Sequence, residues 1–392
     1  MNDHSVRAEF EPLNAVRVHT PGLELWSGSV DPEPNLCDEH VPPDRARREH
    51  ERIVETLDGA GVEVHQLADD LAAGGYLEEL VAEYASVPDG VDLDTMLDSF
   101  EPREALQLAL ARARFERHPE GATSVHVDRP ISNVFFQRDT TLVGDRGPVL
   151  CEMHEPVRQP EVPIVRRAWE TLGAEFAHEM SGEPLEGGEF LPVGEFALLG
   201  VSAAVDGEEV VIRTSYDAGT RLLDAGAVGY DEVGLVRAPL EADRRLREEY
   251  GIESRVMHLL GWCNVADEGL AVLDADLARH ATVDVYARDG DGYALDRSTD
   301  TLDYVESKGF DVVDVSPTER WPTNFLAVEG GRVIPLYEPD ADGEYRPENN
   351  PTIERLKERG VEVLPDGEGL PRAALTNGAG GIHCMTTPLS RG

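Results

Sequence analysis

Lysine is almost absent from this sequence, and basic residues of any kind are few. The 392 residues include 35 lysines and arginines against 77 aspartates and glutamates, which gives a formal net charge of −42. The two lysines are Lys308 and Lys357. Because the acidic residues are spread along the whole chain, their field repels nucleic acid and anionic membranes, and we expect neither as a partner. Such a surface fits a halophilic protein in a salt-rich cytosol, where ions screen the repulsion.

Cysteine is also scarce, and long apolar runs are missing. The four cysteines are Cys37, Cys151, Cys263 and Cys384, and their wide spacing predicts neither a zinc module nor a disulfide framework. No run of about 18 apolar residues occurs, so no membrane span is expected. The N-terminus has no basic segment followed by an apolar one, so we expect no secretory signal and a cytoplasmic location.

The sequence does contain a unit that recurs five times, in which a helical stretch ends at a glycine and a short β-rich run follows. The five copies occupy residues 48–64, 167–176, 246–253, 302–313 and 353–363. Glycine at the end of a helix is a common stop signal. This repetition predicts an α/β fold of five pseudo-symmetric modules closed into a ring, with the functional residues on the central axis. The alternative is an ordinary α/β protein whose helices have similar sequences.

Between these units lie strand pairs that are punctuated by glycine. The pattern predicts hairpins that join residues 133–136 to 148–150, 189–193 to 196–199, 264–265 to 270–273, and 324–328 to 333–336.

The first two units are separated by more residues than the others. The excess covers about residues 67–120, where residues 77–84 and 105–112 have helical periodicity and residues 92–97 are predicted to begin a further helix. We therefore predict a small helical insertion within a single domain of residues 1–392.

A glycine-rich stretch near the C-terminus, residues 377–388, contains Cys384. Glycine lets the backbone approach a bound molecule closely, and a thiolate is a strong nucleophile when its pKa is lowered. Cys384 is therefore a candidate nucleophile. The alternative is a glycine-rich turn before a last strand, with a buried and inert cysteine.

Three other stretches bring polar residues to the predicted ends of strands. Residues 133–139 lead from Asn133 through three apolar residues to Asp139. Glu186 and Glu189 flank two glycines, and His258 follows a predicted strand. In so acidic a chain any single carboxylate is most simply a solvated surface group, and a single histidine is most simply structural. The functional interpretation therefore depends on the whole set.

Together the four stretches resemble the arginine deiminase family. Residues 133–139 look like its N-x-x-F-x-R-D stretch, and residues 186–189 look like its E-G-G-D. Residues 257–259 look like the start of its M-H-L-D, and residues 380–386 look like its G-G-x-H-C-M-T. The motifs occur in the family's order over nearly the whole chain. The resemblance implies a five-module α/β propeller of the pentein type, with a helical insertion near the N-terminus.

The resemblance also implies a reaction and a role for each motif residue. Arginine would be hydrolysed to citrulline and ammonia through a covalent thiouronium intermediate, without a metal or an organic cofactor. The implied roles are Cys384 as nucleophile, His258 as general acid and base, Glu186 and Asp139 as guanidinium ligands, and Asn133, Arg158 and Glu189 as further substrate contacts. Paired carboxylates suit a planar guanidinium because they bind it through charge-assisted hydrogen bonds. The partner would be a small guanidino compound, and a homo-oligomer is possible.

The sequence departs from the family pattern at three places. Leu260 stands where the family has an aspartate two residues after the histidine, and Ala379 stands where an arginine usually precedes the cysteine. Residues 201–204 lack an arginine that is expected near them. These departures leave two alternatives open: a related deiminase or amidinotransferase for another guanidino compound, and a binding relative with low activity.

Overall fold

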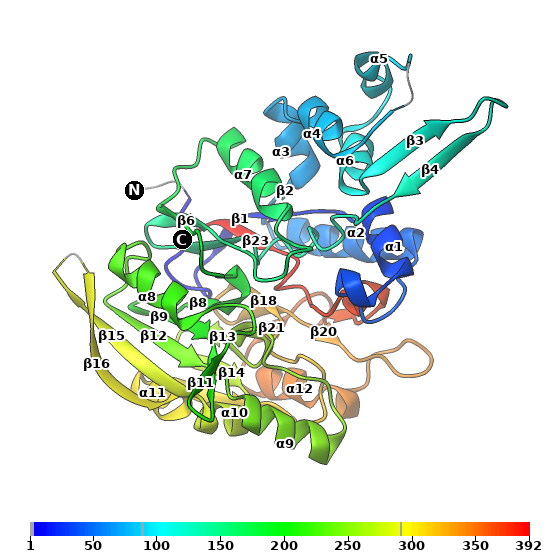
Figure 1. The fold of residues 1–392 in the computed structure, drawn as a ribbon. Helices are drawn as coiled ribbons and strands as arrows, with labels where there is room; N and C mark the ends of the chain where they lie inside the picture. Colours follow the sequence, from blue (N-terminus) through cyan, green and yellow to red (C-terminus); the bar gives the residue numbers. More distant parts are fainter. Residues whose placement is uncertain (1–3, 88–89, 291) are drawn as a thin grey trace.

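Five sheets in the computed structural model share one pattern, in which two antiparallel strands are joined by a third strand parallel to one of them. The structure describes residues 4–87, 90–290 and 292–392. In each sheet the parallel strand is reached through a helix, as parallel pairing requires a crossover connection. Figure 1 shows these sheets grouped in one body with the helices outside them.

The strands of the five sheets are as follows. The first contains β1 (Leu13–Val18), β2 (Glu63–Gln66) and β23 (Thr387–Arg391), and the second contains β5 (Thr141–Gly144), β6 (Gly147–Leu150) and β7 (His178–Glu179). The third contains β8 (Phe190–Pro192), β9 (Phe196–Val201), β12 (Glu232–Arg237), β15 (Thr282–Asp289) and β16 (Gly292–Asp300). The fourth contains β13 (Cys263–Asp267), β14 (Leu270–Leu273) and β17 (Asp311–Asp314), and the fifth contains β18 (Leu326–Glu329), β19 (Arg332–Ile334) and β21 (Glu362–Val363).

The helices that lead to the parallel strands are, in the same order, α2 (Pro43–Gly59), α7 (Glu161–Thr171), α8 (Tyr216–Asp224), α11 (Thr301–Ser307) and α12 (Pro351–Glu358). Their buried residues recur with helical spacing. In α7, for example, Ile164, Val165, Ala168 and Trp169 are buried, and the Trp169 indole donates a hydrogen bond to Thr141 of β5 at 3.1 Å. Each helix thus covers its sheet with one apolar face.

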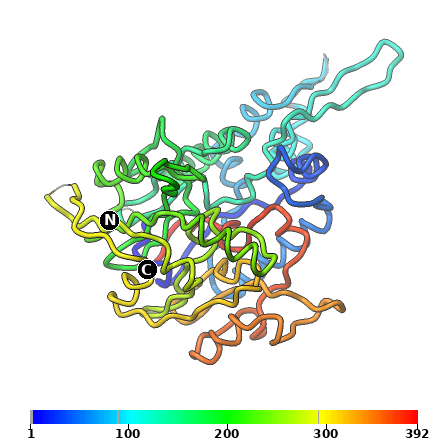
Figure 2. The backbone as a smooth tube through the Cα atoms, turned by 60° about the horizontal axis from the view of Figure 1, so that its bottom comes forward, coloured from blue at the N-terminus to red at the C-terminus, as the bar shows by residue number. Residues whose placement is uncertain are grey.

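The two ends of the chain meet in the first sheet. β23 pairs antiparallel with β1, so the strand after the cysteine motif lies beside the first strand of the chain. Figure 2 shows the blue N-terminal and red C-terminal segments running together through the interior. This pairing brings the N-terminal segment next to the residues around Cys384.

Three of the predicted hairpins are confirmed: β8 with β9, β13 with β14, and β18 with β19. The fourth is wrong, because the partner of β6 is β5 at Thr141–Gly144 and residues 132–135 form turns. The apolar residues 134–136 are buried but do not form a strand. The rings of Phe135 and Phe136 lie against Gly378 and Gly380, where an added Cβ would approach the rings to 2.7 and 2.5 Å.

The prediction of a helix–glycine–strand unit at residues 246–253 is wrong. The helix at α9 (Leu240–Tyr250) is present, but no strand lies between it and His258 in this described part of the chain. The third unit consists instead of α8 and β12. His258 therefore follows an irregular segment and immediately precedes a short 3₁₀ helix at Leu259–Gly261, rather than ending a strand.

The segment at residues 67–120 is helical only in its first part. It contains α3 (Leu67–Ala73), α4 (Leu77–Tyr84), α5 (Leu93–Leu97) and α6 (Pro102–Leu110), and the hairpin of β3 (Ala113–Arg117) and β4 (Thr123–Val127) follows. The segment thus differs from the purely helical prediction. Figure 1 shows α5 and this hairpin reaching away from the five sheets.

The remaining elements are short. They are α1 (Leu23–Val30), α10 (Ala275–His280), the two-stranded sheets of β10 (Ala203–Val205) with β11 (Glu208–Val210) and β20 (Leu336–Tyr337) with β22 (Leu370–Pro371), and the 3₁₀ helices Glu33–Asn35, Gly187–Glu189, Pro347–Asn349 and Ala374–Gly378. Among the described residues, no helix has the length and apolar character that crossing a membrane requires.

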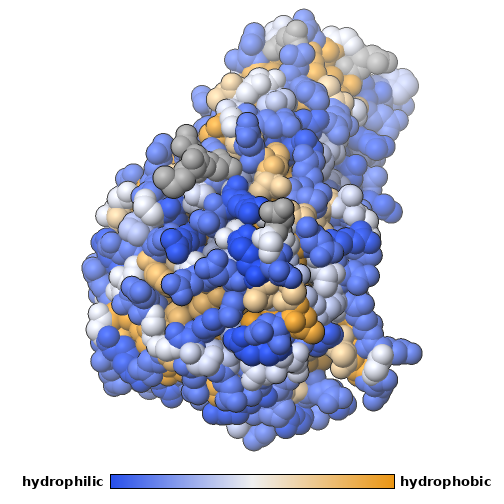
Figure 3. Space-filling view, turned by 90° about the vertical axis from the view of Figure 1, so that its left-hand side faces the viewer, coloured by the Kyte–Doolittle hydropathy of each residue, from blue (hydrophilic) through white to orange (hydrophobic). Residues whose placement is uncertain are grey.

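The acidic surface predicts that the fold depends on salt. Figure 3 shows hydrophilic side chains over most of one face, and the net charge of −42 makes their mutual repulsion strong in dilute buffer. We expect the melting temperature to rise as KCl is increased to roughly 1 M, where the Debye length is ~3 Å. Circular dichroism melts over this range would measure the effect. A melting temperature that stays flat would contradict it.

Candidate active site

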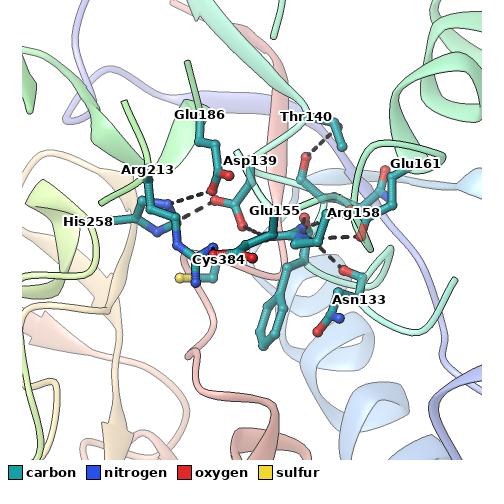
Figure 4. A network of polar contacts seen from close by, with 12 residues as sticks. Asn133, Asp139, Thr140, Glu155, Arg158, Glu161, Glu186, Arg213, His258 and Cys384 are labelled. Carbon is teal, nitrogen blue, oxygen red and sulfur yellow. Dashed lines mark hydrogen bonds and ion pairs between the residues drawn. The ribbon is translucent and has the colours of Figure 1, made fainter. Parts of the chain in front are cut away.

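Five of the predicted site residues line one cavity of about 530 Å³: Asn133, Asp139, Arg158, His258 and Cys384. They come from turns and loops that are far apart in the sequence. Figure 4 shows Asp139 between His258 on one side and Arg158 on the other, with Cys384 close by. A larger neighbouring groove of about 1300 Å³ contains none of these five residues, so the chemistry points to the smaller cavity.

The two glycines between Glu186 and Glu189 allow this convergence. A Cβ on Gly188 would lie 2.7 Å from both Asp139 Oδ1 and His258 Nδ1, and a Cβ on Gly187 would lie 2.2 Å from the carbonyl oxygen of Arg138. Any larger side chain would push these groups apart. The glycine pair therefore serves the close packing of protein groups at the site.

His258 is held between two carboxylates. Its Nε2 lies 2.9 Å from Glu186 Oε2, and its Nδ1 lies 3.9 Å from Asp139 Oδ1. Burial by itself lowers the pKa of His258, but Asp139, Glu186 and Glu189 outweigh burial, and the net shift is upward. The imidazole is therefore more readily protonated than a free histidine, as a proton donor to a leaving group requires.

Glu186 is fully buried and has both carboxylate oxygens engaged. Oε1 accepts the backbone N–H of His154 at 3.0 Å, and Oε2 faces His258. Burial raises its pKa, yet the hydrogen bond and charge of His258 outweigh burial and bring it to about 2. Glu186 does not line the cavity. This geometry lets Glu186 orient His258, and its direct contact with a guanidinium stays a prediction.

Asp139 directs its Oδ1 toward His258 and its Oδ2 toward Arg158. Its Oδ2 accepts a 2.6 Å hydrogen bond from Arg158 Nη1, whereas its Oδ1 is buried without a hydrogen-bond partner among the described residues. Leaving a buried oxygen unpaired is costly. This oxygen is thus available for a donor that enters the cavity, such as a guanidinium N–H.

Arg158 is fully engaged by the protein. Besides Asp139 it binds Glu161 in bidentate fashion, with Nε to Oε1 at 3.0 Å and Nη2 to Oε2 at 2.9 Å. All three guanidinium nitrogens are therefore occupied, and the side chain fixes Asp139. A direct contact between Arg158 and a substrate carboxylate stays a prediction.

Cys384 lies at the cavity with its sulfur close to Asn324, whose Nδ2 donates a hydrogen bond to Sγ at 3.0 Å. Burial, followed by the charge of Asp139, raises the pKa of the Cys384 thiol to about 11. The unliganded protein therefore holds a protonated thiol at neutral pH. Asn324 lies outside the four motifs and 60 residues from Cys384, so no local sequence pattern points to it.

A buried charge cluster centred on Glu9 links Arg138, which precedes Asp139, to His383, which precedes Cys384. Glu9 Oε1 accepts hydrogen bonds from Arg138 at 3.2 Å, from Arg391 at 3.1 Å and from His383 Nε2 at 2.8 Å. Burial lowers the pKa of His383 to about 4, so the cluster contains two cationic arginines and one carboxylate. Glu9 lies in no recognisable motif, and its partners lie 129 to 382 residues away in the sequence.

Arg213 is a second residue that the motifs missed. It lines the cavity, with Nη1 at 3.2 Å from Glu155 Oε1 and Nη2 at 3.3 Å from the sulfur of Met257. Its Nε has no hydrogen-bond partner among the described residues. The β10–β11 hairpin lies between Gly200 and Arg213.

Comparison with known proteins identifies the family. Residues 109–212 match the family model described as arginine deiminase. An arginine deiminase of Halobacterium salinarum is 35% identical over 469 aligned positions, which cover 98% of this chain and 96% of that protein. The chain belongs to the arginine deiminase family. An arginine deiminase of Listeria innocua is 22% identical and covers 100% of this chain and 99% of its own length.

Solved structures agree with this family at the level of the fold. A DDAH from Pseudomonas aeruginosa complexed with citrulline has a TM-score of 0.54 at 13% identity and covers 96% of this chain and 98% of that one. An amidinotransferase from Microseira wollei has a TM-score of 0.55 at 13% identity and covers 99% and 97%. The fold is thus the mixed α/β fold that arginine deiminases share with these enzymes.

Two departures from the arginine deiminase pattern have clear structural settings. Leu260 is buried in a core cluster with Val256 and Trp262 and does not line the cavity. A carboxylate at this position would be buried among apolar groups, so Leu260 is a core residue here. Ala379 lines the cavity, has a φ of 67° and carries only a methyl group there.

Glu189 lies outside the cavity lining of this arginine deiminase relative. Its Oε2 accepts the backbone N–H of Leu259 at 2.6 Å, which holds the residue next to His258. Burial raises the pKa of Glu189 to about 7. The geometry favours a positioning role, and direct contact with substrate stays a prediction.

Asp139, Glu186 and His258 also offer three ligand atoms within 4.8 Å of one another, as a divalent metal ion would require. Carboxylate and imidazole are common metal ligands. The carboxylates also give this end of the cavity a negative charge, which suits a cationic ligand.

Proposed function

We propose that this chain hydrolyses L-arginine to L-citrulline and ammonia. The observation that carries the proposal is one cavity in which the Cys384 thiol and the His258 imidazole meet an oxygen of Asp139 that has no hydrogen-bond partner among the described residues. The 35% identity to an arginine deiminase over nearly the whole chain supports the same reaction. The substrate class is a small guanidino compound, and no metal or organic cofactor takes part in the proposed steps.

The first step forms the covalent intermediate. Asp139 Oδ1 accepts an N–H of the guanidinium and holds its carbon over Cys384. The cation offsets the negative charge that raises the pKa of the thiol, so the thiolate forms when substrate is present. The thiol proton passes to His258 as the sulfur attacks the guanidinium carbon. His258 then donates this proton to the departing nitrogen, and ammonia leaves a thiouronium on Cys384.

The second step releases citrulline. Neutral His258 accepts a proton from water as the water oxygen attacks the thiouronium carbon. The carbon–sulfur bond then breaks, its electron pair returns to sulfur, the hydroxyl proton of the intermediate passes to the thiolate, and the neutral ureido product leaves. His258 releases the proton it took from water to solvent. Glu186 keeps the imidazole in place through both proton transfers, since it contacts Nε2 and leaves Nδ1 on the Asp139 side.

We assign the amino-acid end of arginine to Arg213 and Asn133, and we assign Arg158 to fixing Asp139. In the part of the chain that the structure describes, Arg213 lines the cavity and its Nε has no hydrogen-bond partner, whereas Arg158 is saturated by Asp139 and Glu161. An arginine side chain recognises a carboxylate through charge-assisted hydrogen bonds.

Arg213→Ala should therefore raise KM for arginine by ~10- to 100-fold, with a smaller change in kcat, because it removes one charge-assisted hydrogen bond. KM for agmatine, which lacks the carboxylate, should hardly change. Arg158→Ala should instead lower kcat for both compounds, because it leaves two buried carboxylates unpaired. Steady-state kinetics with both substrates would separate the roles. Equal KM increases for arginine and agmatine in Arg213→Ala would contradict the assignment.

The function itself is tested by a panel of arginine, agmatine, methylarginine and guanidinoacetate, with ammonia and citrulline measured separately. Arginine should give the highest kcat/KM. A higher value for another compound would favour the related deiminase, and transfer of the amidino group to an amine would favour the amidinotransferase. Absence of turnover in salt-rich buffer would favour the binding relative.

We also propose that the five sheets are the five modules of an α/β propeller, forming one domain over residues 1–392 in a cytoplasmic enzyme. The repeated sheet pattern and the fold neighbours support the propeller. We keep the segment at about residues 67–120 as an insertion between the first and second modules, and a homo-oligomer as possible.

A further inference from the structure

Asn324 contacts the reacting atom of Cys384. Its Nδ2 lies 3.0 Å from Sγ, a short distance for a nitrogen donor and a sulfur acceptor. Asn324 itself is buried and does not line the cavity. It therefore reaches the sulfur without occupying the space that a substrate needs.

We propose that Asn324 is a catalytic residue of the proposed reaction, which donates its side-chain N–H to the Cys384 thiolate. An amide nitrogen can only donate, so the sulfur must be the acceptor. A donor binds an anionic acceptor about twice as strongly as a neutral one. The contact thus favours the thiolate over both the thiol and the covalent thiouronium, in which the sulfur is neutral.

The orientation of the amide is fixed by its other end. Asn324 Oδ1 accepts the backbone N–H of His383 at 3.0 Å and that of Cys384 at 3.4 Å. A flipped amide would place its NH₂ group against these two donors and its oxygen against the sulfur. Gly381 makes the arrangement possible, since a Cβ there would lie 2.7 Å from Oδ1.

The loop that carries Asn324 is held on both sides. The side chain of fully buried Asn264 donates to the carbonyl oxygens of Thr323 at 2.8 Å and Phe325 at 3.0 Å. The Thr323 hydroxyl donates to the carbonyl oxygen of Leu260 at 3.1 Å, two residues beyond His258. The donor is thus preorganised relative to both the nucleophile and the general acid, and no reorganisation is needed when charge develops on sulfur.

The chemistry at Cys384 needs such a donor twice. Sulfur becomes anionic before it attacks the guanidinium carbon, and it becomes anionic again when the carbon–sulfur bond breaks. The nearby carboxylate of Asp139 opposes both events. Because Asn324 is neutral, it can stabilise the thiolate without repelling the guanidinium cation.

The decisive variant is Asn324→Asp, because a carboxylate retains the acceptor for the two backbone N–H groups and loses the donor to sulfur. Its effect is read in the protein without substrate, as the rate of Cys384 alkylation by iodoacetamide against pH, quantified by mass spectrometry. We expect alkylation below the thiol pKa to slow by ~10- to 100-fold, the range for one hydrogen bond to a charged atom. We expect kcat for arginine to fall by at least as much.

Two further variants complete the test. Asn349→Asp makes the same chemical change at an exposed position and should leave both measurements unchanged. Asn324→Ala also removes the donor and should shift alkylation in the same direction, so that misfolding of one variant, judged by near-UV circular dichroism, still leaves a measurement.

A folded Asn324→Asp or Asn324→Ala protein with the parental alkylation profile would overturn the inference and reduce Asn324 to a loop-holding residue. The alkylation assay uses no guanidino substrate. Slower alkylation in a protein that does not turn over arginine would therefore support the role of Asn324 and reject the proposed function.

Discussion

Replacing Cys384 with serine is expected to lower arginine turnover by ~10⁴-fold or more, as removal of a catalytic nucleophile does in other covalent enzymes. A serine hydroxyl is far less acidic than a thiol, and the carboxylates around it oppose its ionisation further. The fold should change little, because the substitution is nearly isosteric. Turnover and near-UV circular dichroism of the same preparation would measure both effects. Near-full activity in Cys384→Ala would refute the mechanism.

The other cysteines supply the matched control. Cys263 is buried in the core and lies outside the cavity, so Cys263→Ala should retain turnover.

In the unaltered protein, iodoacetamide should label Cys384 before Cys37, Cys151 and Cys263, which are all buried, and arginine should slow the labelling. Because the pKa of Cys384 is about 11 without substrate, labelling should accelerate steadily between pH 7 and 10. A plateau near pH 7 would show that the thiolate is already formed.

Short sequence motifs predicted those parts of the active site in which neighbouring residues in the sequence are all constrained by the packing or the chemistry. Glycines beside Cys384 and between Glu186 and Glu189 are visible in the sequence, because close packing at these points excludes every larger side chain. No comparable motif surrounds Asn324, Arg213 or Glu9. Each of them contacts partners that are distant in the sequence and come close only in the folded chain.

The predicted strands and helices are correct where the spacing of apolar residues has a single structural explanation. The hairpin of β8 and β9 has a glycine turn between two buried runs, and the structure confirms it. Residues 133–136 failed because three consecutive buried residues suggested a strand, whereas the rings of Phe135 and Phe136 are buried against glycines of the cysteine motif. The third unit failed because α9 ends at Gly251 in the expected way, yet the chain then leads to His258 without pairing. Sequence pattern reports burial and helix ends more directly than it reports which strand pairs follow.

The site also shows why so acidic a chain keeps arginine at particular buried positions. Arg138, Arg158 and Arg391 each bind a buried carboxylate within or directly behind the active site. Arginine can satisfy several acceptors at once through a planar fork, which a single lysine ammonium does less well. The Glu9 cluster is the clearest case, because one carboxylate oxygen there serves two arginines and a histidine.

Replacing Glu9 with glutamine is accordingly expected to lower the free energy of unfolding by about 3–5 kcal/mol, the usual result of breaking a buried ion pair from one side. The isosteric amide would leave Arg138 and Arg391 as buried cations without their shared carboxylate. Chemical denaturation followed by circular dichroism would measure the loss. The control Glu358→Gln removes the same charge from an exposed position and should change stability by less than about 0.5 kcal/mol.

The pH dependence of the free energy of unfolding is a second test of the role of Glu9. Burial raises the pKa of Glu9, but Arg391, Arg138 and His383 outweigh burial and hold the pKa well below its usual value of 4.5. The unfolded chain therefore binds a proton near pH 4.5 that the folded protein does not bind. The stability that Glu9 supplies is present above that pH and is lost as the pH falls toward the lower, folded-state pKa. The free energy of unfolding should thus decline less steeply below pH 4.5 in Glu9→Gln than in the unaltered protein. Equal slopes would show that Glu9 is already protonated in the folded state and that the two arginines are balanced by other groups.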